Sequence, residues 1–188
     1  MVPRPGPHRR PVTALARAAV PFIILTLTAC EEGPRTVADR RVDDPWAFAQ
    51  PIMAEGPLLV QVEGDPFDAG DPVVASHVVA AMTEAVTWTD TARFTADADR
   101  AANRDIRIVV TLNGASGLSG REQCLGRSSG GGPRPDGRID VSASFCDGPT
   151  QLGTVHGQAH AERVDGRAFV ALMRQITIDM LSPHRSAP

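Results

Sequence analysis

The segment R-I-D-V-S-A-S-F-C, residues 138–146, decides the fold class because apolar and polar side chains alternate along it. Alternate side chains of an extended strand point to opposite faces, so this segment has one apolar face and one polar face. The apolar face carries Ile139, Val141, Ala143 and Phe145, and the polar face carries Asp140, Ser142 and Ser144. D-G-P-T at 147–150 is a turn sequence, and residues 151–162 are expected to return as a partner strand. The segment predicts a β-hairpin.

Three segments that precede this hairpin in the chain have shorter strand patterns. Residues 105–112 are rich in isoleucine and valine, and L-L-V-Q-V at 58–62 is a shorter apolar run. Residues 93–96 are expected to form a minor strand. β-Branched and apolar residues favour the pleated, half-buried surface of a sheet. These segments therefore add to the sheet that the hairpin begins.

Two segments have apolar residues at helical spacing. The first begins at Asp71-Pro72, where Asp71 is expected to accept backbone N–H bonds as the N-cap and Pro72 has no N–H to leave unpaired. It runs to about Thr87. The second is expected to start at a cap formed by Asp165 and to stop at Leu181-Ser182-Pro183. The order of elements predicts an α+β fold, with two helices packed on one face of a largely antiparallel sheet of about four to five strands.

The 188 residues leave room for a single folded domain. We expect this domain to span residues 57–183 and to be followed by a short tail at 184–188. Residues 30–56 are rich in charge and proline and lack sustained periodicity, so they are expected to form a tether. Some apolar residues of the tether are expected to pack back on the domain, the alternative being a partner-binding segment: Trp46, Phe48, Ile52 and Met53.

The amino-terminal end has the features of an export leader. It contains basic residues, no acidic residue before Glu31, and an apolar run at 18–29. That run suits the apolar region of a signal peptide and is shorter than the ~20 residues that a membrane-spanning helix needs. It ends in Leu27-Thr28-Ala29-Cys30, a branched apolar residue and two small residues followed by cysteine.

This ending resembles the lipobox of bacterial lipoproteins. The resemblance implies that residues 1–29 are a signal peptide and that Cys30 is acylated as the first residue of the mature chain. Two or three acyl chains anchor a protein stably. Glu31 stands where many such proteins carry an aspartate that retains them in the inner membrane, which favours the periplasmic face of the outer membrane. The hairpin motif D-V-S-A-S-F-C-D-G also resembles one in uncharacterised envelope lipoproteins of α+β type.

The cysteine count agrees with the lipobox. If Cys30 carries lipid, Cys124 and Cys146 remain as an even pair in an oxidising compartment, where a structural disulfide is expected. One alternative is a redox-active pair, although the spacing does not resemble C-x-x-C. The other alternative is two buried free thiols.

His156, His160 and Glu162 are the candidate metal ligands of the chain. On a strand, all three point to the same face, and imidazole and carboxylate groups are zinc ligands. However, positions 156 and 160 of a strand lie about 13 Å apart at ~3.3 Å per residue, too far to chelate one ion. We therefore expect no metal and no other cofactor, and we place both histidines on the solvent face.

Two functions are compatible with the sequence. The first is a non-catalytic accessory or binding domain, anchored to the membrane by lipid, that displays a surface or the long loop at 113–137 to an envelope protein or cell-wall partner. The second is a small envelope hydrolase or metal-dependent enzyme that uses His156, His160 and Glu162. A net charge of −3 and an isoelectric point near 5.9 argue against nucleic-acid binding.

Overall fold

The computed structural model describes residues 1–2, 33–42 and 44–183. The predicted leader from residue 3, the predicted acylation site Cys30 and the expected tail at 184–188 lie outside these residues. The chain divides into two units, Met1–Glu31 and Glu32–Pro188, and the second holds every helix and strand that is described. Among these elements, no helix is both long and apolar enough to cross a membrane.

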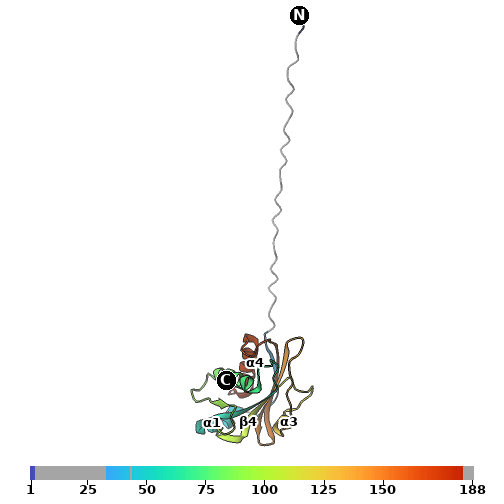
Figure 1. Ribbon diagram of the computed structural model, residues 1–188. Coiled ribbons are helices and arrows are strands. Elements are labelled where there is room, and N and C mark those ends of the chain that lie inside the picture. Colours follow the sequence, from blue (N-terminus) through green and yellow to red (C-terminus); the bar gives the residue numbers. More distant parts are fainter. Residues whose placement is uncertain (3–32, 43, 184–188) are drawn as a thin grey trace. The chain divides into compact units, whose positions relative to one another are not determined.

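The fold is α+β, and it is built on one six-stranded sheet in the order β1-β6-β5-β4-β2-β3 (Figure 1). The strands are β1 Arg35–Arg41, β2 Leu58–Glu63, β3 Phe94–Thr95, β4 Asn103–Leu112, β5 Arg138–Asp147 and β6 Thr150–His160. The predicted hairpin is present as β5 and β6, whose pairing runs from Arg138 opposite His160 to Asp147 opposite Thr150.

The sheet has six strands, where about four to five were expected, and it is mixed, where a largely antiparallel sheet was expected. β1, β6, β5 and β4 pair antiparallel, whereas β2 pairs parallel with both β3 and β4. A helix lies between β2 and the strands that follow it in the chain. Two strands joined by a crossover helix enter the sheet in the same direction, so the pairing of β2 is parallel.

Four helices pack on this sheet, where two were expected. They are α1 Pro45–Glu55, α2 Asp71–Ala85, α3 Gly120–Cys124 and α4 Arg167–Leu181. The helices α1, α2 and α4 contribute to one large core on the first face of the sheet. The short helix α3 contacts β4, β5 and β6 from the second face, and Figure 1 shows α3 on the other side of the sheet from α1 and α4.

The core on the first face is made by the side chains that the sequence pattern assigned to it. Ile139, Val141, Ala143 and Phe145 are all buried there, and α4 contributes Phe169 and Leu172 among others. Burying a side chain of this size contributes about 1.5–3 kcal/mol. Gly157 of β6 lets α4 approach closely, because a Cβ at this position would lie 2.7 Å from Leu172 Cδ1.

Residues 33–56 belong to the domain, which corrects the expected tether at 30–56. β1 pairs with β6 along the sheet edge, with Val37 opposite His156. Pro45 occupies the first turn of α1, and Asp44 caps that helix by accepting from the Ala47 N–H at 3.1 Å. The proline therefore marks a helix start, since its missing N–H would have no partner there anyway.

The apolar residues of this segment pack on the domain as expected, with one exception. Trp46 and Met53 are buried, and the Trp46 ring meets Trp88 edge to face with ring centres 5.5 Å apart. Ile52 is partly buried against the same core, whereas Phe48 is 47% exposed. The domain therefore begins about two dozen residues earlier than position 57.

The two expected aspartate N-caps are not caps. The N-cap of α2 is Gly70, one residue before Asp71, and the N-cap of α4 is Gly166, one residue after Asp165. Asp165 instead pairs with Arg163 at 2.6 Å. Both helices begin within one or two residues of the predicted start, because their apolar faces and not their caps set their position.

Candidate functional site

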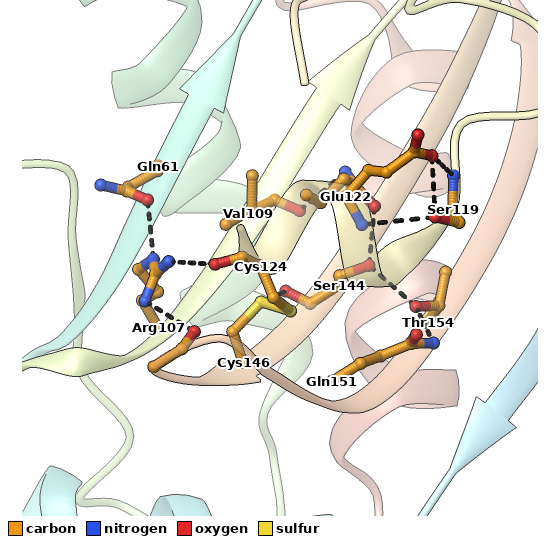
Figure 2. The surroundings of a disulfide bond; sticks show 12 residues. Gln61, Arg107, Val109, Ser119, Glu122, Cys124, Ser144, Cys146, Gln151 and Thr154 are labelled. Carbon is orange, nitrogen blue, oxygen red and sulfur yellow. Dashed lines mark hydrogen bonds between the residues drawn. A yellow bond between two sulfur atoms is a disulfide. The ribbon is translucent and has the colours of Figure 1, made fainter. Parts of the chain in front are cut away.

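The second face of the sheet carries the disulfide. Cys124 at the end of α3 is bonded to Cys146 of β5, with the two Cα atoms 5.5 Å apart (Figure 2). The pair packs against Val109 of β4 in a small second core. The predicted disulfide is therefore present, and it fixes α3 to the end of the hairpin strand.

Gln123, beside the disulfide, joins α3 to the polar side chains of the sheet. Its side chain is fully buried. Nε2 donates to Thr111 Oγ1 and to the Ser142 carbonyl, both at 2.9 Å, while Oε1 accepts from the hydroxyls of Ser142 at 3.0 Å and Ser144 at 2.6 Å. Ser142 and Ser144, two of the polar residues that the alternating pattern placed on this face, thus find hydrogen-bond partners on α3.

The start of α3 is formed by a capping box that the sequence analysis did not identify. Ser119 accepts from the Glu122 N–H, and the Glu122 carboxylate accepts from the Ser119 N–H at 3.0 Å. Hydrogen bonds from the Ser119 backbone and side chain lower the pKa of Glu122. The sequence pattern S-x-x-E at 119–122 is typical of a capping box and could have predicted this helix start.

Gly120 permits the close approach of this helix to the sheet. A Cβ at Gly120 would lie 1.9 Å from Thr154 Oγ1 and 2.7 Å from Ser144 Oγ. Those two hydroxyls hydrogen-bond to each other at 2.8 Å. No side chain larger than hydrogen fits at position 120, so this glycine in an otherwise loop-like sequence has a packing role.

Arg107 of β4 hydrogen-bonds to the carboxyl-terminal end of α3. Its guanidinium donates to Gln61 Oε1 at 2.9 Å, to the Cys124 carbonyl at 2.8 Å and to the Gly148 carbonyl at 3.3 Å (Figure 2). A cation at the carboxyl end of a helix also interacts favourably with the unpaired carbonyls there. One side chain thus connects β2, α3 and the turn between β5 and β6.

A cleft of about 660 Å³ lies beside α3 on the same face. We call it the polar cleft. Strands β1, β5 and β6 line it on one side, and residues 114–119 line it on the other. Its lining includes Val37, Leu118, Arg134, Asp140, Ser142, His156 and Gln158.

Asp140 is the charged centre of the polar cleft. Its carboxylate accepts from Arg134 and from Arg138 Nε, the latter at 2.9 Å. Burial favours the neutral acid and pulls its pKa upward, but the hydrogen bonds and charges of the two arginines outweigh burial and hold the pKa below its ordinary value. The Asp140 N–H also donates to Asn113 Oδ1 at 3.0 Å. The cleft therefore contains a neutralised and anchored carboxylate.

The long loop at 113–137 is held in place at both ends. Asn113 adopts a left-handed backbone, with φ of 50°, and its Nδ2 donates to the Gly132 carbonyl at 2.9 Å. Farther on, the Gly131 N–H donates to the Leu112 carbonyl at 2.8 Å, and a Cβ at Gly130 would lie 2.1 Å from the Glu63 carbonyl oxygen. The glycines here serve close packing across the ends of β2 and β4.

The three candidate metal ligands are not gathered into one site. His156 lines the polar cleft, and His160 lies at the end of β6 on the same face, as predicted from the strand pattern. Glu162 lies past the end of β6 and lines a separate hollow with His160. Within residues 33–42 and 44–183, no group of three or more His, Cys, Asp or Glu side chains is arranged to hold a metal ion.

Fold and site together define a small disulfide-linked α+β domain with its core on one face of the sheet and a polar cleft on the other. No protein-family model and no curated protein matches the chain. Among solved structures, the chain is similar to a PelC variant, described as a dodecamer, from Paraburkholderia phytofirmans. The TM-score is 0.38 and the sequence identity 9%, over 80% of this chain and 95% of that chain. Similarity of this degree does not indicate a function for this chain.

Proposed function

We propose that this protein is a non-catalytic lipoprotein of the cell envelope that binds a partner protein in the polar cleft. The lipobox at 27–30 supports export and anchoring, and the Cys124–Cys146 disulfide fits an oxidising compartment. Glu31 after the acylated cysteine favours the periplasmic face of the outer membrane over the inner membrane.

The polar cleft, on which the proposal rests, is already formed without a partner. The disulfide, Gln123 and the Ser119–Glu122 capping box fix α3, and α3 follows directly on the loop at 114–119 that lines the cleft. A site that is already ordered loses little conformational entropy when it binds, so more of the contact energy appears as affinity.

The lining of the cleft suits a polypeptide. Val37, which is 67% exposed, and Leu118 offer apolar contacts beside hydroxyl, amide and guanidinium groups. No Phe, Tyr or Trp is among the lining residues that the structure describes, so the cleft lacks the large ring surface on which a sugar would stack. The mixture of apolar and hydrogen-bonding groups resembles the core and rim of a protein interface.

The anchoring half of the proposal is tested by replacing Cys30 with serine. We expect the wild-type protein to carry an acylated amino-terminal cysteine in mass spectra, and Cys30→Ser to accumulate as unprocessed precursor. An unmodified amino terminus on wild-type protein from membranes would contradict the proposal.

The binding half is tested by photocrosslinking in native membranes. A photoreactive residue in place of Val37 should give one discrete adduct, and the same residue in place of Val73, which is 43% exposed on α2, should not. Ser116→Trp should abolish the Val37 adduct, because Ser116 is an exposed lining residue whose replacement would fill the cleft. An adduct that survives this filling would place the partner elsewhere.

A further inference from the structure

One edge of the sheet is left open where β3 ends. β3 is only two residues long, and it pairs with Leu58 and Leu59 at the start of β2. On its other side, β2 is paired with β4 as far as Glu63. Within the part of the chain that the structure describes, residues 60–63 therefore have a neighbouring strand on one side only. An open edge presents N–H and C=O groups to any chain that can lie beside it.

Val62 carries backbone groups that point to this open side. The Leu58 N–H donates to the Arg93 carbonyl at 2.8 Å, so Leu58 turns its backbone groups toward β3. Backbone groups alternate between the two sides of a strand, and those of Val62, four residues on, point the same way. β3 does not reach Val62, because its last pair joins Leu59 to Thr95. The Val62 N–H and C=O thus face outward from the sheet.

A groove of about 730 Å³ borders these groups, and we call it the edge groove. Residues 60–62 of β2 line it. One wall is the amino-terminal half of α2, with Pro72, Ala75 and Val79, and the other contains residues 94–97. The side chain of an added strand would therefore find apolar partners beside the open backbone groups.

The charged groups of the edge groove favour a basic ligand. Asp71 and Asp97 line it and are exposed. Asp97 accepts from the Asp99 N–H at 2.9 Å, but neither carboxylate forms an ion pair with another residue that the structure describes. Arg100 also lines the groove, so carboxylates outnumber guanidinium groups there by two to one. Such a surface attracts a cationic partner more than an anionic one.

The opposite edge of the sheet is less suited to an added strand. The outermost strand there is β1, whose pairing with β6 is interrupted between Ala38 and Arg40. Irregularities of this kind twist an edge strand and hinder its pairing with another chain. Residues 60–63 of β2, in contrast, pair with β4 in unbroken register. The open edge of β2 is therefore the straighter template.

We propose that the edge groove binds an extended, basic segment of a partner protein, which adds to the sheet as a further strand beside β2. The segment exchanges backbone hydrogen bonds with Val62, its alternate apolar side chains pack between β2 and α2, and a basic side chain reaches Asp71 or Asp97. In recognition of this kind, main-chain bonds supply affinity and side-chain contacts supply specificity. The edge groove and the polar cleft border different strands, so the proposal does not rest on the function proposed for the cleft.

The test uses the full protein in an uncharged detergent and the synthetic peptide R-V-T-V-R at up to about 1 mM, the weak end of specific binding. Occupancy of about nine molecules in ten should slow hydrogen exchange at the Val62 amide about tenfold, as measured by NMR. Two versions of the peptide are N-methylated at alternate residues. The version whose methyl groups face β2 should bind at least about tenfold more weakly than the other.

Two exposed positions on α2 give a matched pair of variants. Ser76 lines the edge groove, so Ser76→Trp should fill it and abolish the protection of Val62. Ala80 is also exposed but is not among the lining residues, so Ala80→Trp should leave the protection unchanged. The charge-reversed peptide E-V-T-V-E should bind about fivefold more weakly than R-V-T-V-R.

Unchanged exchange at Val62 with about 1 mM peptide, or protection that survives Ser76→Trp, would overturn the proposal. A dimer in sedimentation that Ser76→Trp dissociates would also overturn it, because the groove would then hold a second copy of this chain. None of these outcomes alters the crosslinking test at Val37. Val73, the control position of that test, is not among the residues that line the edge groove. Failure of strand addition is thus distinguishable from failure of the proposed function.

Discussion

The two faces of the sheet are held together by different kinds of interaction. On the first face, α1, α2 and α4 bury a continuous apolar core that includes Phe145 and Phe169. On the second face, the five-residue α3 covers the sheet with one disulfide, one buried glutamine and a small apolar cluster around Val109. The packing of the first face depends on the apolar area that it buries, and that of the second face on a few directional bonds.

The first face is suited to stability and the second face to binding. Apolar burial is non-directional and grows with area, so the first face tolerates small shifts of its helices. The hydrogen bonds of Gln123 require defined positions, and each contributes only about 0.5–1.5 kcal/mol net. The second face is thus more exactly positioned and more easily disrupted, and it is the face that carries the polar cleft.

The largest effect is expected from opening a cavity in the first face. Phe145→Ala removes a fully buried ring of β5 and should lower the free energy of unfolding by about 3–5 kcal/mol. Chemical denaturation measures this loss. Phe48→Ala is the control, because Phe48 is 47% exposed and its loss should cost well under half as much. Similar losses in the two variants would mean that this core does not dominate stability.

The disulfide should have the next largest effect. Replacing Cys124 and Cys146 together with serine releases a loop closed over a separation of 22 residues, which costs about 3 kcal/mol in the chain-entropy treatment. Reduction of the wild-type protein should give a similar shift in the denaturation midpoint. If thiol labelling of unfolded, unreduced protein modifies both cysteines, the bond does not form in the cell and the prediction is wrong.

Gln123→Ala should lower the free energy of unfolding by about 2 kcal/mol, because the hydroxyls of Ser142 and Ser144 then lose Gln123 Oε1 as their acceptor. Gln175→Ala is the control, since Gln175 on α4 is only part-buried and donates to Asp179 at 2.8 Å. A double-mutant cycle that combines Gln123→Ala with the replacement of both cysteines by serine measures whether Gln123 and the disulfide stabilise α3 cooperatively. Strictly additive losses would indicate that α3 is not one cooperative unit.

The smallest effect is expected at Asp140. Its pKa is lower in the folded protein than the ordinary 3.8, so it stabilises the fold above that pH and loses the contribution as the pH falls through the folded-state pKa. Asp140→Asn should therefore cost under about 1 kcal/mol at neutral pH, as the site is partly exposed. The difference from wild type should vanish in acid. A difference that persists at low pH would point to packing in place of charge.

The elements with a clear local pattern were predictable from the sequence. The hairpin of β5 and β6, the strands β2 and β4 and the helices α2 and α4 lie within a few residues of their predicted positions. In each, the residues that share a face are close neighbours along the chain, so the period of the pattern alone reports which face is buried. Cysteine parity likewise predicted the Cys124–Cys146 pair.

The site was predictable only in part. His156 was correctly placed on the polar face of β6, but the polar cleft around it needs Val37 of β1 and Leu118 of the loop, which lie far from it in the chain. Gln123 gave no signal of its own, because a single glutamine in a glycine- and serine-rich segment is typical of a solvated loop.

The sequence alone therefore predicted the elements whose buried face repeats locally and the pairing of Cys124 with Cys146. The signal peptide at 1–29 stays a prediction. Tertiary contacts bring β1 and α1 into the domain and place α3 over the polar face. β1 is stabilised by pairing with β6 at the other end of the chain, and α3 by the buried contacts of Gln123 and Gly120. Such short elements are marginal in isolation, so the partners that stabilise them exist only once the chain has folded.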